Sequence, residues 1–242
     1  MRTETDEAAE RFFGGTAPLL LTCEHASARL PDTEKWADAD LWLPPTHWAF
    51  DLGARDFVLE LASHLGCPAV LARFSRLWAD ANRAETDADL FRTEAEGRAI
   101  ALNAHLSDGE RERRLREYHR PYHAAVDRML SEHPGRLVFS VHTFTPVYHG
   151  EPREVEVGVL FDEEDDLAAD LALALFDQGQ DAWLNEPYSG KEGLIFSASS
   201  HAKRSGRIAL ELEIRQDLAT DPAWRSAMIP KLAAALAEVG LL

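Results

Sequence analysis

The sequence predicts an α/β fold of three layers, in which helices cover both faces of a mostly parallel mixed sheet. Short apolar runs that fit buried strands alternate along the chain with longer segments that carry apolar residues at helical spacing. Glycine or proline stands where several of these segments should end. With 242 residues and 45% hydrophobic content, the chain is long enough for one substantial domain, which we expect to span residues 1–242.

The first elements predict a β-α-β unit. We expect the acidic segment at the start, residues 1–15, to be frayed. The apolar run at residues 19–23 follows Pro18 and predicts a buried strand. Residues 51–65 fit a helix, which Gly66 and Pro68 should end before a second strand through residues 70–71.

The rest of the chain repeats this alternation. A charged segment with apolar residues at helical spacing predicts a helix over residues 110–132, which Pro134 and Gly135 end before a strand at 137–141. Further elements are expected as a strand at 155–161, a helix at 165–176, a strand at 208–214 and an amphipathic helix at 222–236.

The net charge and the composition indicate which classes of partner the protein binds. A formal charge of -17 disfavours nucleic acid and anionic lipid surfaces, which clustered Lys and Arg normally bind, so we expect a small-molecule substrate. No apolar run reaches the roughly 18 residues that span a bilayer, and the first residues lack the apolar core of a signal peptide. We therefore expect a cytoplasmic protein, with Cys23 and Cys67 as buried reduced thiols.

Ionisable side chains follow or end three of the predicted strands. Glu24 and His25 follow the first strand, His142 follows the strand after Pro134, and Glu213 lies near the end of the last strand. In open α/β sheets the ligand crevice lies beyond the carboxyl ends of the strands, so we expect these residues to converge. In the last strand the apolar residues share one face, which places Glu211 and Glu213 together on the other.

This set of residue types suits a catalytic zinc ion. Zinc takes imidazole and carboxylate ligands on three positions and leaves the fourth for water, whose pKa falls toward about 7. A nearby carboxylate can then take the proton as the water attacks a carbonyl. A single strand-end histidine is more often a structural hydrogen-bonding group, and a single strand glutamate is usually ion-paired. Their coincidence at three strand ends favours the catalytic interpretation.

A second group of residues suits an anionic substrate. Arg76, Asp80, Asn82 and Arg83 lie within one short segment after the second strand of the predicted sheet. Guanidinium groups bind carboxylates with two hydrogen bonds, and an arginine near a metal can polarise a scissile carbonyl. On composition alone, the alternative of a solvated loop with an ion pair between Asp80 and Arg83 is favoured.

A third group lies on the long predicted helix. His119 and His123 are four residues apart, the spacing of a two-histidine metal site, but the glutamate of a His-Glu-x-x-His motif is absent. Tyr122 and His123 fit equally well as packing residues whose polar ends reach a cleft. A similar spacing joins His47 and Asp51, where Asp51 is alternatively a helix N-cap.

Taken in order, seven motifs resemble the N-formylglutamate amidohydrolase family. They are Cys23–Ser27, His47–Ala54, Ser75–Leu77, Asp80–Arg83, Tyr118–His123, Val141–Pro146 and Glu211–Asp217. The resemblance covers the chain from Leu19 to Leu218. It implies a phosphorylase/hydrolase-like three-layer fold, related to the zinc carboxypeptidases and to aspartoacylase.

The resemblance also implies roles for individual residues. His25 and His142 would hold Zn²⁺, and Glu213 would be the general base or acid. Asn82 and Arg83 would clamp a substrate carboxylate, while Arg76 would polarise the carbonyl or bind a second carboxylate. Residues also expected to bind the substrate are Tyr122, His123 and Arg215. The segment 185–190 and His201 resemble a loop that borders the substrate in the family.

The sequence departs from the carboxypeptidase and aspartoacylase relatives at one ligand. Those relatives use His-x-x-Glu, whereas the residue three after His25 is Ala28. We expect Asp51 as the third ligand, with Glu24 in reserve because adjacent strand residues point to opposite faces.

The expected function is therefore zinc-dependent hydrolysis of an N-formyl or N-acyl amino acid, with N-formyl-L-glutamate as the leading case. One alternative is the same chemistry on another N-acyl amino acid or a short peptide, since pocket shape decides between these. Another is a small-molecule binding protein without metal. The hydrolase hypothesis requires His25 and His142 to lie within about 6 Å of each other, with Glu213 at the same end of the sheet.

Overall fold

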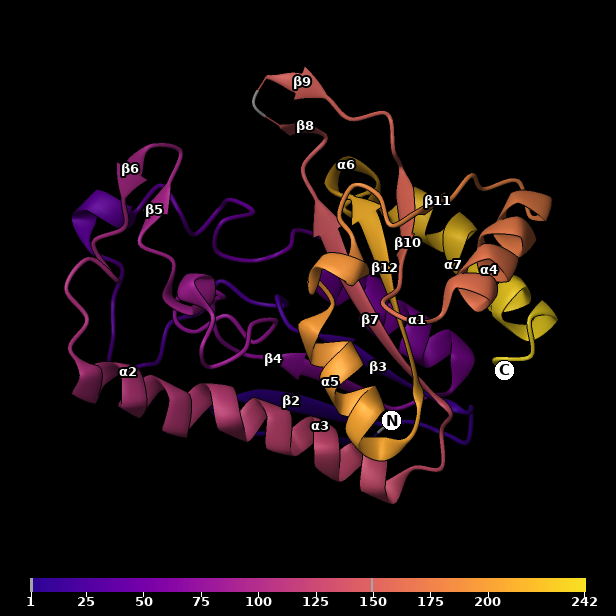
Figure 1. The fold of residues 1–242 in the computed structure, drawn as a ribbon, viewed down its shortest axis with the longest axis horizontal. Helices are drawn as coiled ribbons and strands as arrows, with labels where there is room; N and C mark the ends of the chain where they lie inside the picture. The colour runs from indigo at the N-terminus through magenta and orange to yellow at the C-terminus, as the bar shows by residue number, and fades with distance from the viewer. Residues whose placement is uncertain (1, 149) are drawn as a thin grey trace.

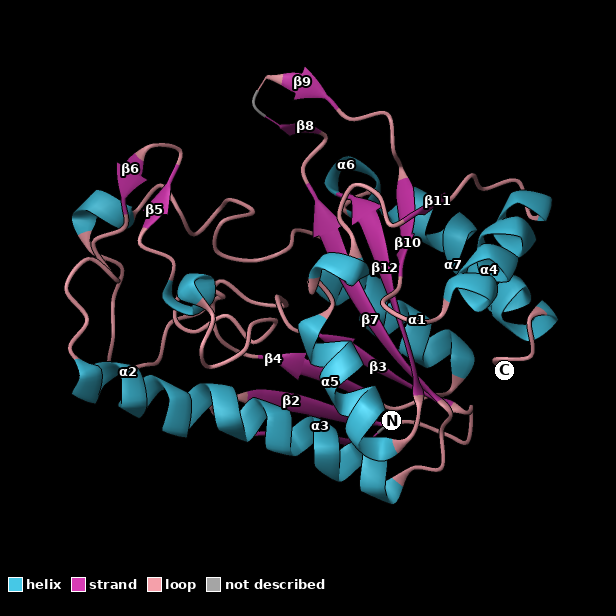
Figure 2. Ribbon diagram, in the orientation of Figure 1, coloured by secondary structure: helices cyan, strands magenta, loops and turns pink. Residues whose placement is uncertain are grey.

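The computed structural model describes residues 2–148 and 150–242, which fold around one mixed sheet with helices on both faces (Figures 1 and 2). The strand order is β1-β2-β4-β3-β7-β12-β10-β11. The four central strands β4, β3, β7 and β12 are parallel, whereas β2 and β10 run antiparallel to their inner neighbours. The prediction of a three-layer α/β fold with a mostly parallel mixed sheet is confirmed.

The strands of the sheet are Arg2–Thr5 (β1), Ala9–Phe13 (β2), Leu19–Cys23 (β3), Ala69–Ala72 (β4), Leu137–Phe144 (β7), Val157–Leu160 (β10), Trp183–Leu184 (β11) and Ile208–Arg215 (β12). Two small hairpins pair Glu94–Ala95 (β5) with Arg98–Ala99 (β6) and Val147–Tyr148 (β8) with Glu151–Pro152 (β9). The helices are Ala54–Leu65 (α1), Asp108–Arg114 (α2), Arg120–Glu132 (α3), Asp165–Asp177 (α4), Phe196–Ser205 (α5), Gln216–Ala219 (α6) and Pro222–Glu238 (α7).

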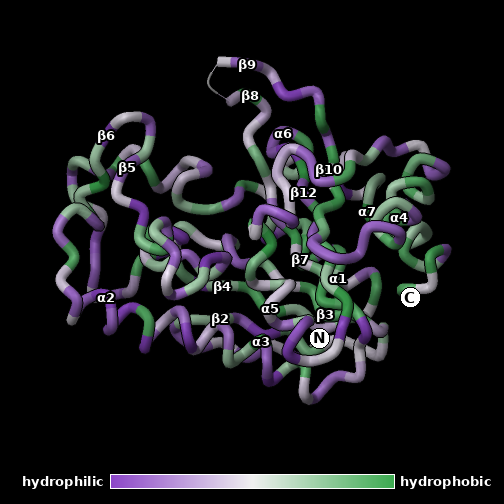
Figure 3. Tube along the Cα trace, viewed as in Figure 1, coloured by the Kyte–Doolittle hydropathy of each residue, from purple (hydrophilic) through white to green (hydrophobic). Residues whose placement is uncertain are grey.

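One face of the sheet is covered by α1, α4 and α7. Leu210, Leu212 and Ile214 point from β12 into this core, as the alternation along that strand predicts, and Leu232 and Leu236 of α7 belong to the same cluster. In Figure 3 the hydrophobic colour gathers on the central strands, which places the apolar core between the layers.

The other face is covered by α3 and α5. The helix predicted over 110–132 is present as one helical segment that runs from α2 to α3, with a π-helical turn at Leu115–His119 between them. The sequence pattern does not predict α5, because the segment FSASSHAKRS has no strong apolar repeat.

The prediction of a frayed segment at residues 1–15 is wrong, because β1 and β2 pair with each other and β2 pairs with β4. Two apolar side chains explain why this segment is ordered, since Ala9 and Phe12 are buried against the sheet. The Asp6 carboxylate fixes the connecting turn by accepting hydrogen bonds from the backbone N–H of Ala8 and Ala9.

The helix predicted from residue 51 begins at Ala54, and its N-cap is Gly53 rather than Asp51. Gly53 has a φ of +84° and packs so tightly that a Cβ would lie 2.5 Å from the carbonyl carbon of Ala219. The chain before Gly53 therefore leaves the helix axis and carries Asp51 away from it. This bend frees the Asp51 carboxylate for the interactions described below.

Irregular segments lie beyond the carboxyl ends of β3 and β4 and surround a small core of their own, with Leu43, Ala49 and Leu77 at its centre. The β8–β9 hairpin extends beyond the end of β7 (Figure 1). Among the described residues, no helix combines the length and the apolar character needed to cross a membrane.

Candidate active site

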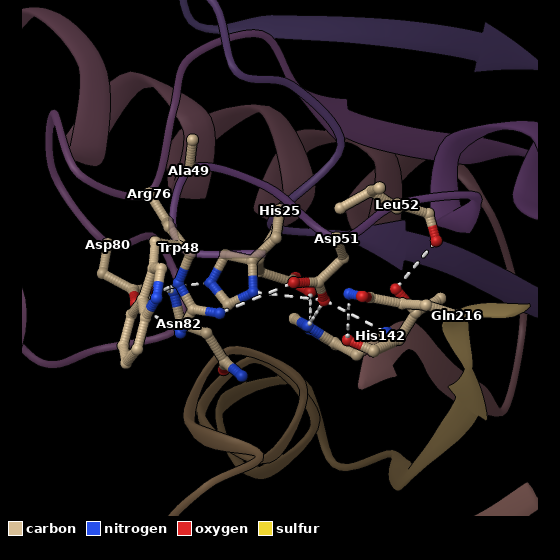
Figure 4. Close-up of polar contacts among 12 residues, drawn as sticks. His25, Trp48, Ala49, Asp51, Leu52, Arg76, Asp80, Asn82, His142 and Gln216 are labelled. Carbon is tan, nitrogen blue, oxygen red and sulfur yellow. Dashed lines mark hydrogen bonds and ion pairs between the residues drawn. The ribbon is translucent and has the colours of Figure 1, made fainter. Parts of the chain in front are cut away.

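Three side chains from distant parts of the chain meet at the carboxyl ends of the parallel strands (Figure 4). The rings of His25 and His142 are 4.6 Å apart, centroid to centroid. Asp51 Oδ2 lies 2.9 Å from Nδ1 of His142 and 3.4 Å from Nδ1 of His25. One nitrogen from each ring and one carboxylate oxygen all lie within 4.8 Å of one another, and all three residues are buried. The two histidines therefore lie within the distance of about 6 Å that the hydrolase hypothesis requires.

Backbone pairing fixes these positions. His142 is the sixth residue of β7, and its register partner on the parallel strand β12 is Glu213, so both side chains point to the same face. The backbone N–H of Asp51 donates to the carbonyl of His25 at 2.9 Å, and the N–H of Thr143 donates to Asp51 Oδ2 at 3.1 Å. Asp51 is thereby tied to the ends of both β3 and β7.

Opposite charges stabilise each other in this group. Burial opposes ionisation of Asp51, but His25 and His142 outweigh it and hold the pKa of its carboxyl well below the usual range. Burial likewise disfavours the charged form of His142, but Glu211, Asp51 and Glu24 raise the pKa of that imidazole well above its ordinary value. A concentration of negative charge of this kind attracts a cation.

The donor set of His25, Asp51 and His142 fits a divalent metal ion. His25 Nδ1 is buried, faces Asp51 and has no hydrogen-bond partner among the described residues. A buried polar atom without a partner is costly, and a metal ion would satisfy it. Two nitrogens and one carboxylate oxygen are ligands typical of a catalytic site with an open position.

Glu24 lies outside this ligand set because its oxygens are already engaged. Its Oε1 accepts a hydrogen bond from the Tyr122 hydroxyl at 2.8 Å, and its Oε2 accepts from Ser140 Oγ at 2.7 Å and lies 3.0 Å from His142 Nε2. Asp80 has the same relation to the other ring, since its Oδ1 lies 2.7 Å from His25 Nε2. Of the two candidates for the third ligand, the structure favours Asp51.

Glu213 lines the same cavity as the His-Asp-His group. Its Oε2 is buried without a hydrogen-bond partner among the described residues. Burial and the neighbouring carboxylate of Glu211 raise the pKa of Glu213 well above its usual range. Burial also raises the pKa of Glu211, to about 8. Perturbed carboxyl groups in a cleft are typical of acid-base sites.

Three arginines line the cavity, and they differ in their partners. Arg76 donates to Asp80 Oδ2 and lies 3.5 Å from Asp51 Oδ1. Arg92 pairs with Asp89. The Arg83 guanidinium has no hydrogen bond or ion pair within the described part of the chain, so it is free to bind an anion.

Asn82 also lines the cavity, but its amide holds the chain that leads into α5. Its Nδ2 donates to the Leu194 carbonyl, and its Oδ1 accepts from the Ser197 N–H. The amide has a second N–H, for which the described residues provide no hydrogen bond.

Tyr122, His123 and Arg215, expected beside the substrate, do not line this cavity. Tyr122 is fully buried under the site and bonds to Glu24. His123 faces α5, where its Nδ1 lies 2.9 Å from Nε2 of the buried His201. Arg215 ends β12 and pairs with Asp217. Each side chain is held by a partner that spacing alone does not reveal.

Four aromatic residues that line the cavity were not predicted from the sequence: Trp48, Phe144, Tyr148 and Tyr188. The contact of Asp80 with His25 was not predicted either. The available signals were the position of Trp48 beside His47 and of Asp80 four residues after Arg76. Tyr188 lies in the segment 185–190 that the resemblance placed near the substrate, and it is the residue of that segment that lines the cavity.

The fold and the site together define an α/β protein with a candidate metal centre at the carboxyl ends of parallel strands. A family model described as N-formylglutamate amidohydrolase matches residues 17–220. The chain belongs to the N-formylglutamate amidohydrolase family.

Three individual proteins are similar to this chain. The chain is 28% identical to an N-formylglutamate deformylase of Pseudomonas putida over 148 residues, a match that spans 54% of each protein and thus about half the length of that relative. A crystal structure of a gene product from Agrobacterium tumefaciens is 28% identical, with a TM-score of 0.88 over 97% of this chain and 96% of the other. An N-formylglutamate amidohydrolase from Ralstonia eutropha, 18% identical, shares the fold with a TM-score of 0.66 over 97% of each chain.

Proposed function

We propose that the protein hydrolyses the amide bond of an N-formyl or other N-acyl amino acid, with N-formyl-L-glutamate as the leading substrate, and that it uses Zn²⁺ held by His25, Asp51 and His142. One observation carries the proposal: a buried His-Asp-His group, a buried glutamate and an unpaired arginine line one cavity. The relatives named for action on N-formylglutamate support the choice of substrate.

Two imidazoles and one carboxylate suit zinc better than the harder cations Ca²⁺ and Mg²⁺, which prefer all-oxygen sites. When bound, a divalent ion supplies Lewis acidity that polarises the scissile carbonyl and makes water a stronger acid. The remaining steps depend on side chains of the chain itself.

Glu213 is the proposed general base and acid. Its carboxylate would take a proton from the attacking water and return it to the nitrogen of the leaving amine, so no net proton is consumed by the enzyme. The raised pKa that burial and Glu211 produce makes this carboxylate a stronger base than an exposed glutamate. A cation bound nearby would counter part of that rise.

Arg83 is the proposed anchor for a carboxylate of the amino acid, assisted by the free N–H of Asn82. A guanidinium and a carboxylate form paired, charge-assisted hydrogen bonds, which would orient the amide bond toward the metal group. Arg76 is the proposed carbonyl-polarising or second carboxylate-binding group, although its ion pairs with Asp80 and Asp51 already engage much of its guanidinium.

The test combines metal analysis with a formate-release assay. Protein purified without chelator should contain about one equivalent of zinc per chain, and chelation should abolish formate release from N-formyl-L-glutamate. Glu213→Gln should lower kcat by about 10²- to 10⁴-fold, the usual contribution of a general base. Glu132→Gln, on the exposed surface of α3, is the matched control. Undiminished turnover by Glu213→Gln would rule out the assigned base.

A substrate panel separates the leading substrate from its alternatives. We expect kcat/KM for N-formyl-L-glutamate to exceed that for N-formyl amino acids with neutral side chains, for N-acetyl-glutamate and for short peptides. A preference for one of these other substrates would keep the hydrolytic chemistry and change the assigned substrate.

A further inference from the structure

Two buried carboxylates stand directly behind the two histidines and are not used as ligands in the proposed function. Asp80 Oδ1 lies 2.7 Å from His25 Nε2, and Glu24 Oε2 lies 3.0 Å from His142 Nε2. Both carboxyl groups are buried, at 4% and 1% exposure respectively. At these distances each pair is a hydrogen bond, and each bond reaches the ring nitrogen that faces away from Asp51.

These bonds determine where the hydrogen of each imidazole lies. An ionised carboxylate only accepts hydrogen bonds, so Nε2 of each ring must carry the hydrogen. In a neutral imidazole the other nitrogen, Nδ1, then keeps its lone pair. In both rings Nδ1 is the nitrogen that faces Asp51. Nδ1 of His142 also lies 2.9 Å from Asp51 Oδ2, and that contact likewise needs a hydrogen on the ring as long as no cation lies between the two atoms. Once a cation displaced the Nδ1 hydrogen, Asp80 and Glu24 would keep the remaining hydrogens on Nε2, and both Nδ1 lone pairs would point into the proposed metal position.

The carboxylates are themselves fixed by further hydrogen bonds. Asp80 Oδ2 accepts from Nε and Nη2 of Arg76 at 3.2 and 2.9 Å, and Oδ1 also accepts from the backbone N–H of Asn82. Glu24 accepts from the hydroxyls of Tyr122 and Ser140. Neither carboxylate can turn without breaking at least two of these bonds.

We propose that Asp80 and Glu24 are positioning residues, which hold His25 and His142 in the Nδ1-free tautomer and in the ring orientation required for metal binding. The inference rests on the proposed function, because it concerns the same metal group. It assigns to Tyr122 a role behind the site: its hydroxyl orients Glu24, which explains why a residue expected at the substrate is fully buried.

Zinc affinity tests the inference without relying on turnover. The full chain is stripped of metal and titrated with Zn²⁺ in competition with a chromophoric chelator. Asp80→Asn and Glu24→Gln should each weaken zinc binding by about 10- to 100-fold, the usual effect of removing a partner behind a metal-bound histidine, while the stoichiometry stays at one. Asp32→Asn and Glu132→Gln, both exposed, are matched controls that should keep the wild-type Kd.

A spectroscopic readout separates a positioning role from a merely structural one. With Co²⁺ in place of Zn²⁺, the visible absorption bands of Asp80→Asn and Glu24→Gln should differ from those of the wild type, because the rings are no longer held in one orientation. The controls should reproduce the wild-type spectrum. Tyr122→Phe keeps the buried ring but frees Glu24 Oε1, and it should weaken zinc binding in the same direction by a smaller factor, so the test stands even if Glu24→Gln fails to fold.

The outcomes distinguish this inference from the function on which it rests. Wild-type zinc binding and formate release, together with unchanged Kd and unchanged Co²⁺ spectra in Asp80→Asn, Glu24→Gln and Tyr122→Phe, would overturn the positioning role alone. A wild-type protein that binds no Zn²⁺ would overturn both.

Discussion

At the scale of single residues, the proposed chemistry depends on which side chains in the cavity lack a partner. Aspartates engage Arg76 and Arg92, whereas the Arg83 guanidinium makes no hydrogen bond or ion pair among the described residues. Its backbone is fixed from both sides, since its N–H donates to the Asp80 carbonyl and its own carbonyl lies 2.9 Å from His119 Nε2. A guanidinium with an anchored backbone and free N–H groups is prepared for an anionic substrate.

We therefore expect Arg83→Met to raise KM for N-formyl-L-glutamate by about 10- to 100-fold, which corresponds to the roughly 1.5–3 kcal/mol of a hydrogen bond to a charged group. The value of kcat should change less, because the group is expected to bind the substrate rather than the reacting bond. Steady-state kinetics of the variant give both constants, with Arg128→Met on the surface of α3 as the control. An unchanged KM would remove Arg83 from the substrate site.

How much of the site the sequence could predict also depends on the individual residue. His25, His142 and Glu213 were predictable because strand ends of a parallel sheet converge, and Asp51 was predictable only with the family resemblance. The contacts of Glu24 and Asp80 were not, because a hydrogen bond between residues 118 or 55 positions apart has no sequence period. For Tyr122 and His123 the packing alternative, raised from the sequence, describes their positions better than substrate binding.

At the scale of elements, the bend before α1 places the carboxylate of the metal group. Because Gly53 has a positive φ, α1 begins after it and does not extend back to Asp51. Gly53 also packs so closely against Ala219, at the end of α6, that no side chain would fit. Asp51 is consequently held by the end of β7, through Thr143, instead of capping α1.

Gly53→Ala should destabilise the protein through both features. An alanine in the left-handed region costs about 1–2 kcal/mol, and forcing a methyl group against the Ala219 backbone adds about 1–3 kcal/mol. Gly97→Ala is the matched control, since Gly97 also has a positive φ but faces open space, so only the first cost applies. Urea unfolding of both variants measures the free energies. Equal losses would show that the contact with Ala219 relaxes at little cost.

Elements with strong apolar periodicity were predictable, and those without it were not. The strands and helices from β3 to α7 that carry an apolar repeat match the predicted ranges within a few residues. β1 was missed because its four residues, Arg2–Thr5, are all polar and exposed, and β2 because charged residues interrupt its short apolar pattern. The helix α5 was missed because its burial comes from small residues such as Ala198 and Ala202. Such elements are determined by the neighbours against which they pack.

At the scale of the whole molecule, polar groups join the two helices, α3 and α5, that cover one face of the sheet. Asp127 of α3 lies 2.6 Å from Nδ1 of the buried His201 in α5, whose Nε2 lies 2.9 Å from Nδ1 of His123 in α3. His119 lies beside them, with its ring 4.5 Å from that of His123. Burial lowers the pKa of all three histidines, that of His123 well below its ordinary value.

This cluster should make the fold sensitive to acid. A histidine whose pKa is lower in the folded state stabilises the protein fully above its unfolded pKa of about 6.5, and that contribution is lost as the pH falls toward the folded pKa, because the unfolded chain takes up the proton first. Each such histidine adds up to about 1.4 kcal/mol per pH unit to the loss of unfolding free energy in that window.

Metal-free wild type and His123→Gln, unfolded in urea between pH 8 and 5.5, should therefore give plots of unfolding free energy against pH that converge as the pH falls. The comparison within one pair of proteins cancels the opposing effect of the -17 net charge, whose repulsion weakens as carboxylates are neutralised in acid. Parallel curves would mean that His123 takes up its proton equally in the folded and unfolded states, and that the layer of α3 and α5 is open to solvent at this point.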